Sequence, residues 1–258
     1  MNQVLFDLSG KVALITGATR GIGLAIAEAM ADAGARVVVS SNEIDACEEV
    51  SAQLCAAGHD ALGIACDVSS RDDLETLVRG TLSQRKQIDI LVCNAGIAPH
   101  TGPIGSASDC DWDLTMTVNL RSVLWLTSLV VPRMAERREG CVIVTSSISG
   151  VRGNKALGLY GLSKAGNAQL VRNLAVEWGP SNVRVNAISP GLIRTEFARP
   201  MLENDEVMTR RLALTPLRRA GEPHEIAGVA VMLASRAGAF ITGQNLIVDG
   251  GTTIGDGN

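Results

Sequence analysis

Residues 16–23 read TGATRGIG, and they join an apolar, β-branched run at 12–16 to a pattern of helical spacing that starts at Ile22. Glycine at 17, 21 and 23 permits a tight turn, lets a pyrophosphate approach the backbone, and allows the helix to pack close to the strand. The free N–H groups of the first helical turn would face the anion. A glycine triplet alone also occurs in plain strand–helix turns, and its GxxxGxG spacing differs from the commoner GxGxxG, so the interpretation depends on the strand and helix beside it.

Outward from this turn, short apolar runs alternate with segments of helical length along the whole chain. Seven of these runs are strand candidates: 12–16, 36–40, 61–66, 88–93, 141–146, 183–188 and 245–248. The alternation predicts one α/β domain over residues 1–258, a Rossmann-type, doubly wound, seven-stranded parallel sheet with helices on both faces. Ligands bind such sheets outside the carboxyl ends of the strands, where the unusual residues of this chain are found.

The composition narrows the class of protein. Of 258 residues, 46% are apolar and 19% charged, which is typical of a globular chain, and the net charge of −4 without a basic cluster argues against nucleic acid as a partner. Six cysteines without a CxxC pair, and a start that lacks a signal pattern, predict a reducing, cytoplasmic location. The apolar stretches are shorter than a membrane span and the three histidines lie far apart, so we expect neither membrane insertion nor a metal.

The sequence YGLSK places Tyr160 and Lys164 four residues apart, on one face of a helix. A nearby ammonium favours the phenolate, so Lys164 would lower the pKa of Tyr160 and make it a usable acid or base. Taken alone, such a pair is more often a solvated helix face. Ser147, at the end of a predicted strand, would donate to a substrate oxygen; Ser146 and Ser149 are rivals, and simple turn chemistry is the alternative for all three.

These motifs together resemble the short-chain dehydrogenase/reductase family, in its short single-domain branch. The resemblance rests on TGATRGIG at 16–23, CNAG at 93–96, Asn119 in MTVNL, Ser147, YGLSK at 160–164 and SPGLIRT at 189–195, and it extends from LSGKVALITG to VDGG at 248–251. It implies a catalytic tetrad in which Tyr160 is acid or base, Ser147 positions the carbonyl, Lys164 binds ribose and tunes the tyrosine, and Asn119 supports a proton-relay water. Cys93 departs from the Asn that is more usual there.

The resemblance also implies which residues contact the cofactor. They are Gly17, Thr19, Arg20, Gly21, Ile22, Gly23, Ser41, Asn42, Asp67, Val68, Asn94, Ala95, Gly96, Tyr160, Lys164, Pro190, Gly191, Ile193 and Thr195. Asp67 could equally be a helix N-terminal carboxylate. The absence of an acid at Ser41 and Asn42 and the presence of Arg20 favour NADP(H), whereas the missing basic residue at Asn42 and the nearby Glu43 leave NAD(H) as the alternative.

The expected function is an NAD(P)(H)-dependent oxidoreductase, a carbonyl reductase in type, that interconverts a ketone and a secondary alcohol of modest size. Residues 192–217 would form a lid over the substrate, beside the loop at 98–106 and the turn at 151–158. The alternative from another class is a catalytically silent dinucleotide-binding sensor or scaffold, which the complete tetrad disfavours. An epimerase or dehydratase would be longer, and an enoyl reductase would have a wider interval between Tyr and Lys.

The resemblance further implies a homotetramer, built through the helices that follow the fourth and fifth strands and through the last strand. Trp112, Trp125 and Trp178 on these helices are candidate interface anchors, although core packing explains them equally well.

Overall fold

The fold is a seven-stranded, fully parallel sheet in the order β3-β2-β1-β4-β5-β6-β7, in a computed structural model that describes residues 5–255. The strands are β1 (Val12–Thr16), β2 (Arg36–Ser41), β3 (Ala61–Ala65), β4 (Ile90–Cys93), β5 (Gly140–Thr145), β6 (Val183–Pro190) and β7 (Asn245–Val248). The predicted Rossmann-type fold class is therefore confirmed. The strand order reverses between β1 and β4, which is where sheets of this kind bind ligands.

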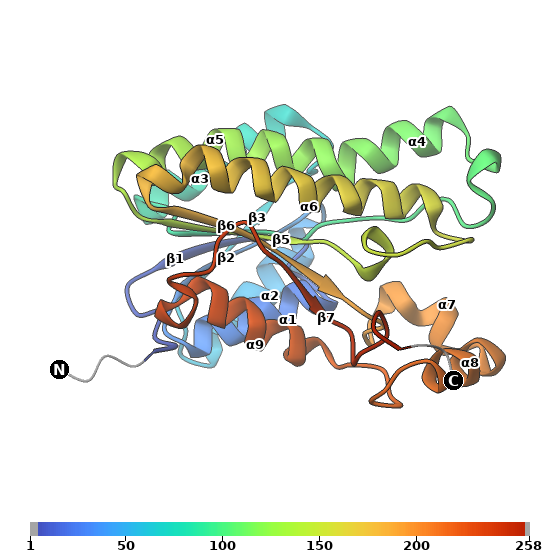
Figure 1. Ribbon diagram of the computed structural model, residues 1–258. Coiled ribbons are helices and arrows are strands. Elements are labelled where there is room, and N and C mark those ends of the chain that lie inside the picture. Colours follow the sequence, from blue (N-terminus) through green and yellow to red (C-terminus); the bar gives the residue numbers. More distant parts are fainter. Residues whose placement is uncertain (1–4, 256–258) are drawn as a thin grey trace.

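Two helical layers cover the sheet. The helices are α1 (Gly21–Asp32), α2 (Ile44–Ala56), α3 (Arg71–Arg85), α4 (Asp109–Met116), α5 (Ser122–Glu136), α6 (Gly158–Trp178), α7 (Arg199–Leu202), α8 (Asp205–Ala213) and α9 (Pro223–Ala234). Figure 1 shows α3, α4, α5 and α6 on one face and α1, α2 and α9 on the other. Each face buries its own apolar cluster, because the strands are buried on both sides and carry apolar residues at successive positions.

The boundaries of β1 and β7 are as predicted, and those of the other five strands shift by one or two residues. Two differences reach two residues. One is at β4, which begins at Ile90 instead of residue 88; the carboxylate of the buried Asp89 just before it accepts the N–H of Val12 at 2.8 Å. The other is at the end of β6, which continues to Pro190, and Pro190 pairs with Val248 of β7.

The segment Asp109–Glu136 is one nearly continuous helix of 28 residues, in which α4 passes through a π turn at Thr117–Arg121 into α5. By length and composition it could cross a membrane, contrary to the expectation that all apolar stretches are too short. Half of its apolar window is nevertheless buried in the domain, where Leu126 and Met134 belong to the cluster under α3, α5 and α6. A core helix passes the same test, so the length alone does not indicate insertion.

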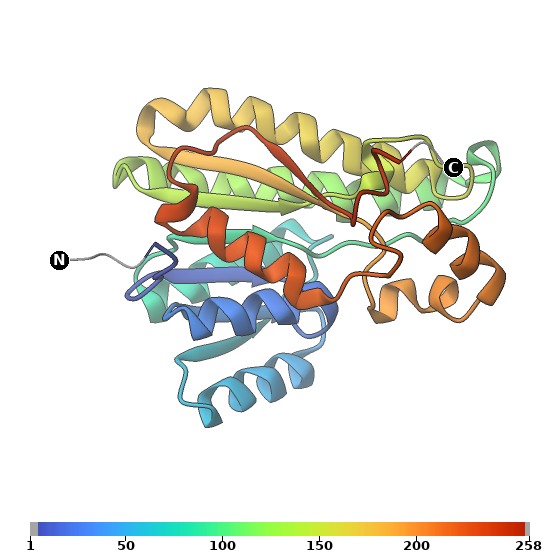
Figure 2. The ribbon, with the colours of Figure 1, turned by 60° about the horizontal axis from the view of Figure 1, so that its bottom comes forward.

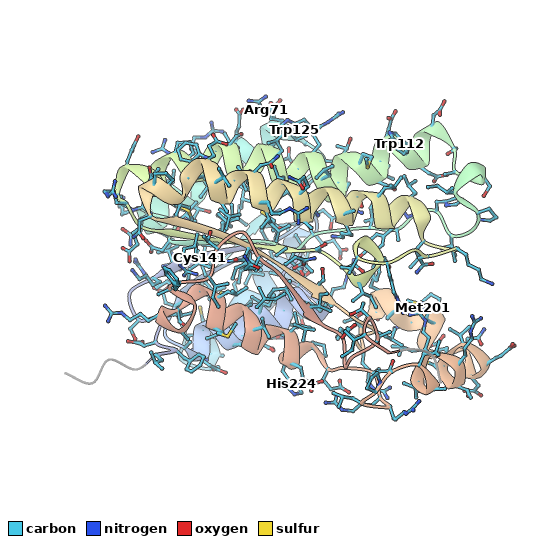
Figure 3. The ribbon with its side chains drawn as sticks, in the orientation of Figure 1. Arg71, Trp112, Trp125, Cys141, Met201 and His224 are labelled. Atoms are coloured by element: carbon cyan, nitrogen blue, oxygen red, sulfur yellow. The ribbon has the colours of Figure 1, made fainter. Side chains whose placement is uncertain are left out.

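The segment 192–217 stands apart from the two helical layers. It carries α7 and α8, which Figure 2 shows as a separate projection at the carboxyl end of the sheet. Of the three tryptophans, Trp112 is exposed, whereas Trp125 and Trp178 pack against the core cluster; Figure 3 shows Trp112 and Trp125 along the outer surface of the α4–α5 layer.

Candidate active site

The glycine-rich turn between β1 and α1 has the backbone that its sequence requires. Gly17 and Gly21 have φ values of 62° and 58°, in the left-handed region that favours glycine. A Cβ on Gly17 would lie 2.9 Å from the Cα of Ala95, and a Cβ on Gly23 would overlap the carbonyl oxygen of Gly17. The turn therefore packs so closely against neighbouring backbone that neither Gly17 nor Gly23 leaves room for a side chain.

The start of α1 is open to an anion. Arg20 occupies the N-cap position but makes no side-chain capping bond, and the first turn contains no acidic residue. The first N–H groups of the helix therefore have no side-chain acceptor within the part of the chain that the structure describes. Together with the close-packed glycines, this arrangement fits a pyrophosphate of a dinucleotide, which such residues would hold through the helix N-terminus.

Asn94 connects three neighbouring strands at the carboxyl edge of the sheet. Its Nδ2 donates to the carbonyl oxygens of Thr16 (3.2 Å) and Gly17 (3.0 Å), and its Oδ1 accepts from the Thr145 hydroxyl at 3.1 Å. The Thr16 hydroxyl in turn accepts the N–H groups of Asn94 (3.1 Å) and Ala95 (3.3 Å). Asn94 thus fixes the glycine turn to β4 and β5.

Of the three serines after β5, Ser147 is the one that interacts with Tyr160. Ser146 is committed elsewhere, because its hydroxyl donates to the carbonyl oxygen of Lys164 at 2.8 Å. Ser149 donates its N–H to the Ser147 hydroxyl at 3.1 Å, which orients that hydroxyl. Burial raises the pKa of the Tyr160 phenol to about 12, and its hydrogen bonding with Ser147 acts in the opposite direction.

Lys164 lies in α6 and is buried, with 3% of its surface exposed. Its Nζ donates to the Thr145 carbonyl oxygen at 2.8 Å and lies 5.5 Å from the centroid of the Tyr160 ring. Burial lowers the pKa of Lys164 to about 8. The net pKa of Tyr160 is therefore raised, contrary to the expected lowering, because desolvation of the phenol dominates in this geometry and Lys164 Nζ is bonded to a backbone oxygen.

Asn119 lies in the π turn and is fully buried. Its side chain bonds both backbone groups of Ile97, accepting the N–H at 2.8 Å and donating to the carbonyl oxygen at 2.8 Å, and it donates to the Ser163 hydroxyl at 3.0 Å. A Cβ on Gly96 would lie 3.1 Å from Lys164 Nζ and 3.3 Å from Asn119 Oδ1. These two predicted residues therefore flank one glycine, whose lack of a side chain leaves room beside the lysine.

Two polar residues of this network were missed by the sequence analysis. The Ser163 hydroxyl donates to the carbonyl oxygen of Tyr160 at 2.7 Å, and Asn167 donates its Nδ2 to the carbonyl oxygen of Asn119 at 2.9 Å. Both are buried. Their signal was present in the sequence, since they follow Tyr160 by three and seven residues and so share its helix face.

The remaining predicted cofactor residues lie at the carboxyl ends of the strands. Residues 17–23 follow β1, Ser41 ends β2 and Asn42 comes after it, Asp67 and Val68 follow β3, residues 94–96 follow β4, and residues 190–195 end and follow β6. Thr195 approaches the glycine turn, because a Cβ on Gly21 would lie 3.2 Å from its Cγ2. Ile193 is buried in the core cluster.

The region expected to contact adenine and its ribose is polar and exposed. Asp67 accepts the N–H (2.9 Å) and hydroxyl (2.8 Å) of Ser69 in a local turn, whereas the N-cap of α3, which was the alternative for this carboxylate, is Ser70. Arg20 lies beside Glu43, with 3.8 Å between Nη1 and Oε1, and 69% of its side chain is exposed. The cation expected to favour a 2′-phosphate is thus paired with the acid expected to oppose it.

The segments expected to surround the substrate come together near Tyr160. Gly102 donates its N–H to the carbonyl oxygen of Ala156 at 2.8 Å, so the loop at 98–106 meets the turn at 151–158. In the segment 192–217, the ring of Phe197 lies 5.8 Å from the ring of Tyr160, centroid to centroid, at an angle of 40°. No group of three His, Cys, Asp or Glu side chains with metal-binding geometry occurs within residues 5–255.

Comparison with known proteins gives concordant results. The family model described as "Enoyl-(Acyl carrier protein) reductase" matches residues 17–253. "Dehydrogenase/reductase SDR family member 4" of Bos taurus is 38% identical over 245 residues, which is 95% of this chain and 88% of that protein. Among solved structures, a gluconate 5-dehydrogenase from Burkholderia cenocepacia in complex with NADP and tartrate has a TM-score of 0.93 at 30% identity, covering 96% of this chain and 97% of that one. A 7 alpha-hydroxysteroid dehydrogenase complexed with NADH and 7-oxo glycochenodeoxycholic acid has a TM-score of 0.92 at 36% identity, covering 95% of both chains.

Proposed function

Because this chain belongs to the short-chain dehydrogenase/reductase family of NAD(P)-dependent oxidoreductases, we propose that it interconverts a ketone and a secondary alcohol, with Tyr160 transferring the proton. The observation that supports this most is the placement of Ser147, Tyr160 and Lys164 together at the carboxyl end of β5, beside Gly96 and the glycine turn. Both named solved relatives are dehydrogenases crystallised with NADP or NADH.

In the reductive direction, Tyr160 would donate its phenolic proton to the carbonyl oxygen while Ser147 donates a hydrogen bond to the same oxygen. A bound nicotinamide supplies the hydride for the carbonyl carbon, or accepts it in the reverse direction. With a pKa of about 12, Tyr160 is fully protonated at neutral pH and so is available as an acid. In the oxidative direction Tyr160 must act as the phenolate, which the Lys164 ammonium would stabilise.

Asn119 would support this proton transfer from a distance, as a positioning residue. Its side chain is occupied by Ile97 and Ser163, and its carbonyl oxygen accepts from Asn167. The remaining lone pair of that carbonyl is the group that would hold a relay water near Lys164. This role depends on the π turn, which places the residue against α6.

The preferred cofactor is proposed to be NADP(H), with NAD(H) as the alternative. Arg20 is the cation expected to meet a 2′-phosphate, and neither Ser41 nor Asn42 adds an acid there. Glu43 weakens this preference because it lies near Arg20, although a pair this exposed contributes little energy.

We also propose a cytoplasmic homotetramer with residues 192–217 as its substrate lid. A reducing location is supported by six free cysteines, four of them buried. Burial raises the pKa of Cys66 and Cys93 to about 12, so these thiols remain protonated and unreactive. The lid is supported by the contact between Phe197 and Tyr160.

The test is to follow absorbance of the reduced nicotinamide while NADPH or NADH is offered with ketones, diketones, aldehydes and an enoyl thioester. We expect ketone-dependent oxidation that the Tyr160→Phe variant loses by about 100-fold or more, since general acid catalysis contributes about that much. Tyr160 is the only tyrosine in the chain, so the variant isolates one phenol. Retained elevation of the melting temperature by cofactor shows that the variant is folded.

Other outcomes separate the competing functions. A cofactor that raises the melting temperature without any turnover would favour the silent binding protein, and no binding at all would refute the interpretation of the glycine turn. Turnover of the enoyl thioester alone would agree with the description of the family model; the three residues between Tyr160 and Lys164 argue against it.

A further inference from the structure

Phe197 is the side chain of the segment 192–217 that reaches the candidate reacting group. Its ring lies 5.8 Å from the ring of Tyr160, centroid to centroid, at an angle of 40°. Phe197 is nevertheless 50% exposed. A large apolar side chain that packs on the phenol, and is also open to solvent, therefore borders the space beside Tyr160.

The backbone holds Phe197 in this place from both sides. Before it, the N–H of Arg194 donates to the carbonyl oxygen of Gly221, and the N–H of Gly221 donates to the carbonyl oxygen of Leu192, both at 2.9 Å. After it, the next residue, Ala198, is buried. Because the chain is fixed before and after Phe197, the position of its ring is determined by the fold.

The other end of the segment is fixed at a second border of the site. The Thr215 hydroxyl lies 3.0 Å from the Thr252 hydroxyl, and the carbonyl oxygen of Thr252 accepts from Nη1 of Arg152 at 3.3 Å. Arg152 belongs to the turn at 151–158. The helices α7 and α8 therefore extend between the contact with Tyr160 and this turn.

The two helices present apolar side chains that the domain covers only in part. Neither α7 nor α8 contains a buried residue. Their half-buried positions are apolar with the exception of Arg211, and they are Met201, Leu202, Val207, Met208 and Leu212. Apolar side chains that are only partly covered can bury more surface against a bound apolar group, and methionine adapts to groups of different shape.

Several polar side chains beside the site are already bonded within the protein. In the turn at 151–158, Asn154 Oδ1 accepts the N–H groups of Ala156 and Leu157, both at 3.0 Å. Beside Phe197, the carboxylate of Glu196 pairs with Arg199 at 2.6 Å. A polyhydroxylated substrate needs free donors and acceptors, since a hydroxyl buried without a partner is unfavourable. These surroundings therefore fit an apolar substituent better than a polyol.

We propose that Phe197 determines the substrate specificity, as the apolar wall against which the larger substituent of the ketone binds, and hence that the preferred substrates carry an extended apolar group. The inference rests on the proposed function, because it identifies the class of substrate used at the same site. The substituent lies away from the reacting carbon, so the wall would stabilise substrate and transition state equally and would act mainly on KM.

The experiment measures kcat and KM for straight-chain methyl ketones from butanone to nonanone, for acetylnaphthalene, and for the polyhydroxylated ketones dihydroxyacetone and fructose. We expect kcat/KM to rise about fourfold with each methylene until the space is filled, as the burial of a methylene predicts. The polyhydroxylated ketones should be poor substrates.

The same series in Phe197→Ala isolates the wall. We expect a loss of about 10- to 100-fold in kcat/KM for acetylnaphthalene, mostly through KM, and of about threefold at most for butanone, whose substituent is too small to cover the ring. The matched control is Phe6→Ala, because Phe6 is also 50% exposed but precedes β1, whereas the site lies at the carboxyl ends of the strands. It should change neither value by more than about twofold.

A second measurement separates this proposal from the proposed function. Calorimetry in the presence of NADPH with N-cyclohexylacetamide, an amide that a nicotinamide does not reduce, and with sorbitol tests the wall without any reaction. Binding of the amide but not of sorbitol, weakened in Phe197→Ala and unchanged in Phe6→Ala, would support the apolar wall even if no ketone were reduced, in which case only the proposed function would fall. Ketone reduction that is independent of chain length, a preference for the polyhydroxylated ketones, or an equal loss for all ketones in Phe197→Ala would overturn the specificity and leave the function standing.

Discussion

Lys164 carries an ammonium that the folded chain buries almost completely. Its pKa of about 8 lies below the ordinary 10.5 because burial penalises the charged form. Below pH 8 both folded and unfolded chains hold the proton, and the folded chain bears the whole cost of burying the charge. Between pH 8 and 10.5 the unfolded chain holds the proton and the folded chain does not, so the free energy of unfolding contributed by this group rises with pH, by about 3 kcal/mol in all.

Replacing Lys164 with methionine should remove that pH dependence. We expect the stability of wild type, relative to Lys164→Met, to increase by about 3 kcal/mol between pH 8 and 10.5, because only the wild type loses a buried charge over this range. The unpaired Thr145 carbonyl oxygen lowers the stability of the variant by an amount that does not depend on pH. Urea unfolding of both proteins across this range measures the difference, and the exposed Lys155→Met serves as the control. A difference that stays constant with pH would contradict the buried ammonium.

Arg20 and Glu43 should set the choice between the two cofactors. We expect Arg20→Gln to raise KM for NADPH about tenfold and to leave KM for NADH unchanged, because it removes about 1.5 kcal/mol of charge-assisted bonding to a 2′-phosphate. Glu43→Gln should lower KM for NADPH, since it removes the carboxylate that lies 3.8 Å from Arg20. Steady-state kinetics with both cofactors measures this. Equal changes for NADPH and NADH would show that Arg20 acts on the shared pyrophosphate instead.

At the scale of residues, the sequence predicted which side chains gather but not how each is bonded. Tyr160, Lys164 and Ser147 were found from helical spacing and strand ends, and all three lie together. The net pKa of Tyr160 is raised and not lowered as predicted, because spacing places the lysine on the same helix face without revealing how far the phenol is buried. Burial, which decides the sign, depends on segments far away in the chain, such as the one that carries Phe197.

The turn between β1 and α1 tolerates no side chain at Gly23. Alanine there would press its Cβ onto the Gly17 carbonyl oxygen and toward Asn94 Nδ2, so we expect Gly23→Ala to lower the free energy of unfolding by about 1–3 kcal/mol and to weaken cofactor binding at least tenfold. The matched control is Gly228→Ala in α9, where no atom lies near the added Cβ and helix propensity should raise stability by roughly 0.5–1 kcal/mol. Melting temperatures with and without NADPH measure both. Unimpaired cofactor binding by Gly23→Ala would show that the turn can move aside.

At the scale of elements, periodicity predicted the strands and most helices. It did not predict the order of the strands in the sheet or the π turn within a helix. The order of the strands depends on which crossovers form. After β3 the chain passes back over β2 and β1, so that β4 pairs with β1 on the side opposite to β2. The π turn at Thr117–Arg121 inserts itself into an otherwise helical pattern, and nothing in the 3.6-residue spacing marks it. Helical spacing places Asn167 on the face of Tyr160, but its bond to Asn119 depends on this turn, so the partner of Asn167 could not be predicted.

On the surface of the whole molecule, apolar side chains are exposed at two places where the sequence predicts contacts between subunits. The outer helical layer exposes Trp112, Leu124 and Val176, the last of which is 81% exposed. Around the edge strand β7, Phe240 is fully exposed and Ile247 is partly so. An edge strand with free backbone groups and apolar neighbours favours pairing with another chain. Two separate surfaces of this kind fit a tetramer with two types of interface.

A charged substitution on either surface should therefore disrupt the interface formed by that surface and leave the other interface intact. We expect wild type to sediment with a mass of about four times 27.0 kDa, and both Val176→Glu and Phe240→Glu to give dimers, because a buried, unpaired carboxylate is strongly unfavourable at an apolar contact. Ile44→Glu is the control, since Ile44 is also an apolar side chain on the surface, 47% exposed, but lies on α2, away from both surfaces. Analytical ultracentrifugation at micromolar concentration distinguishes these states. A monomeric wild type, or variants that keep the mass of the wild type, would refute the two-interface tetramer.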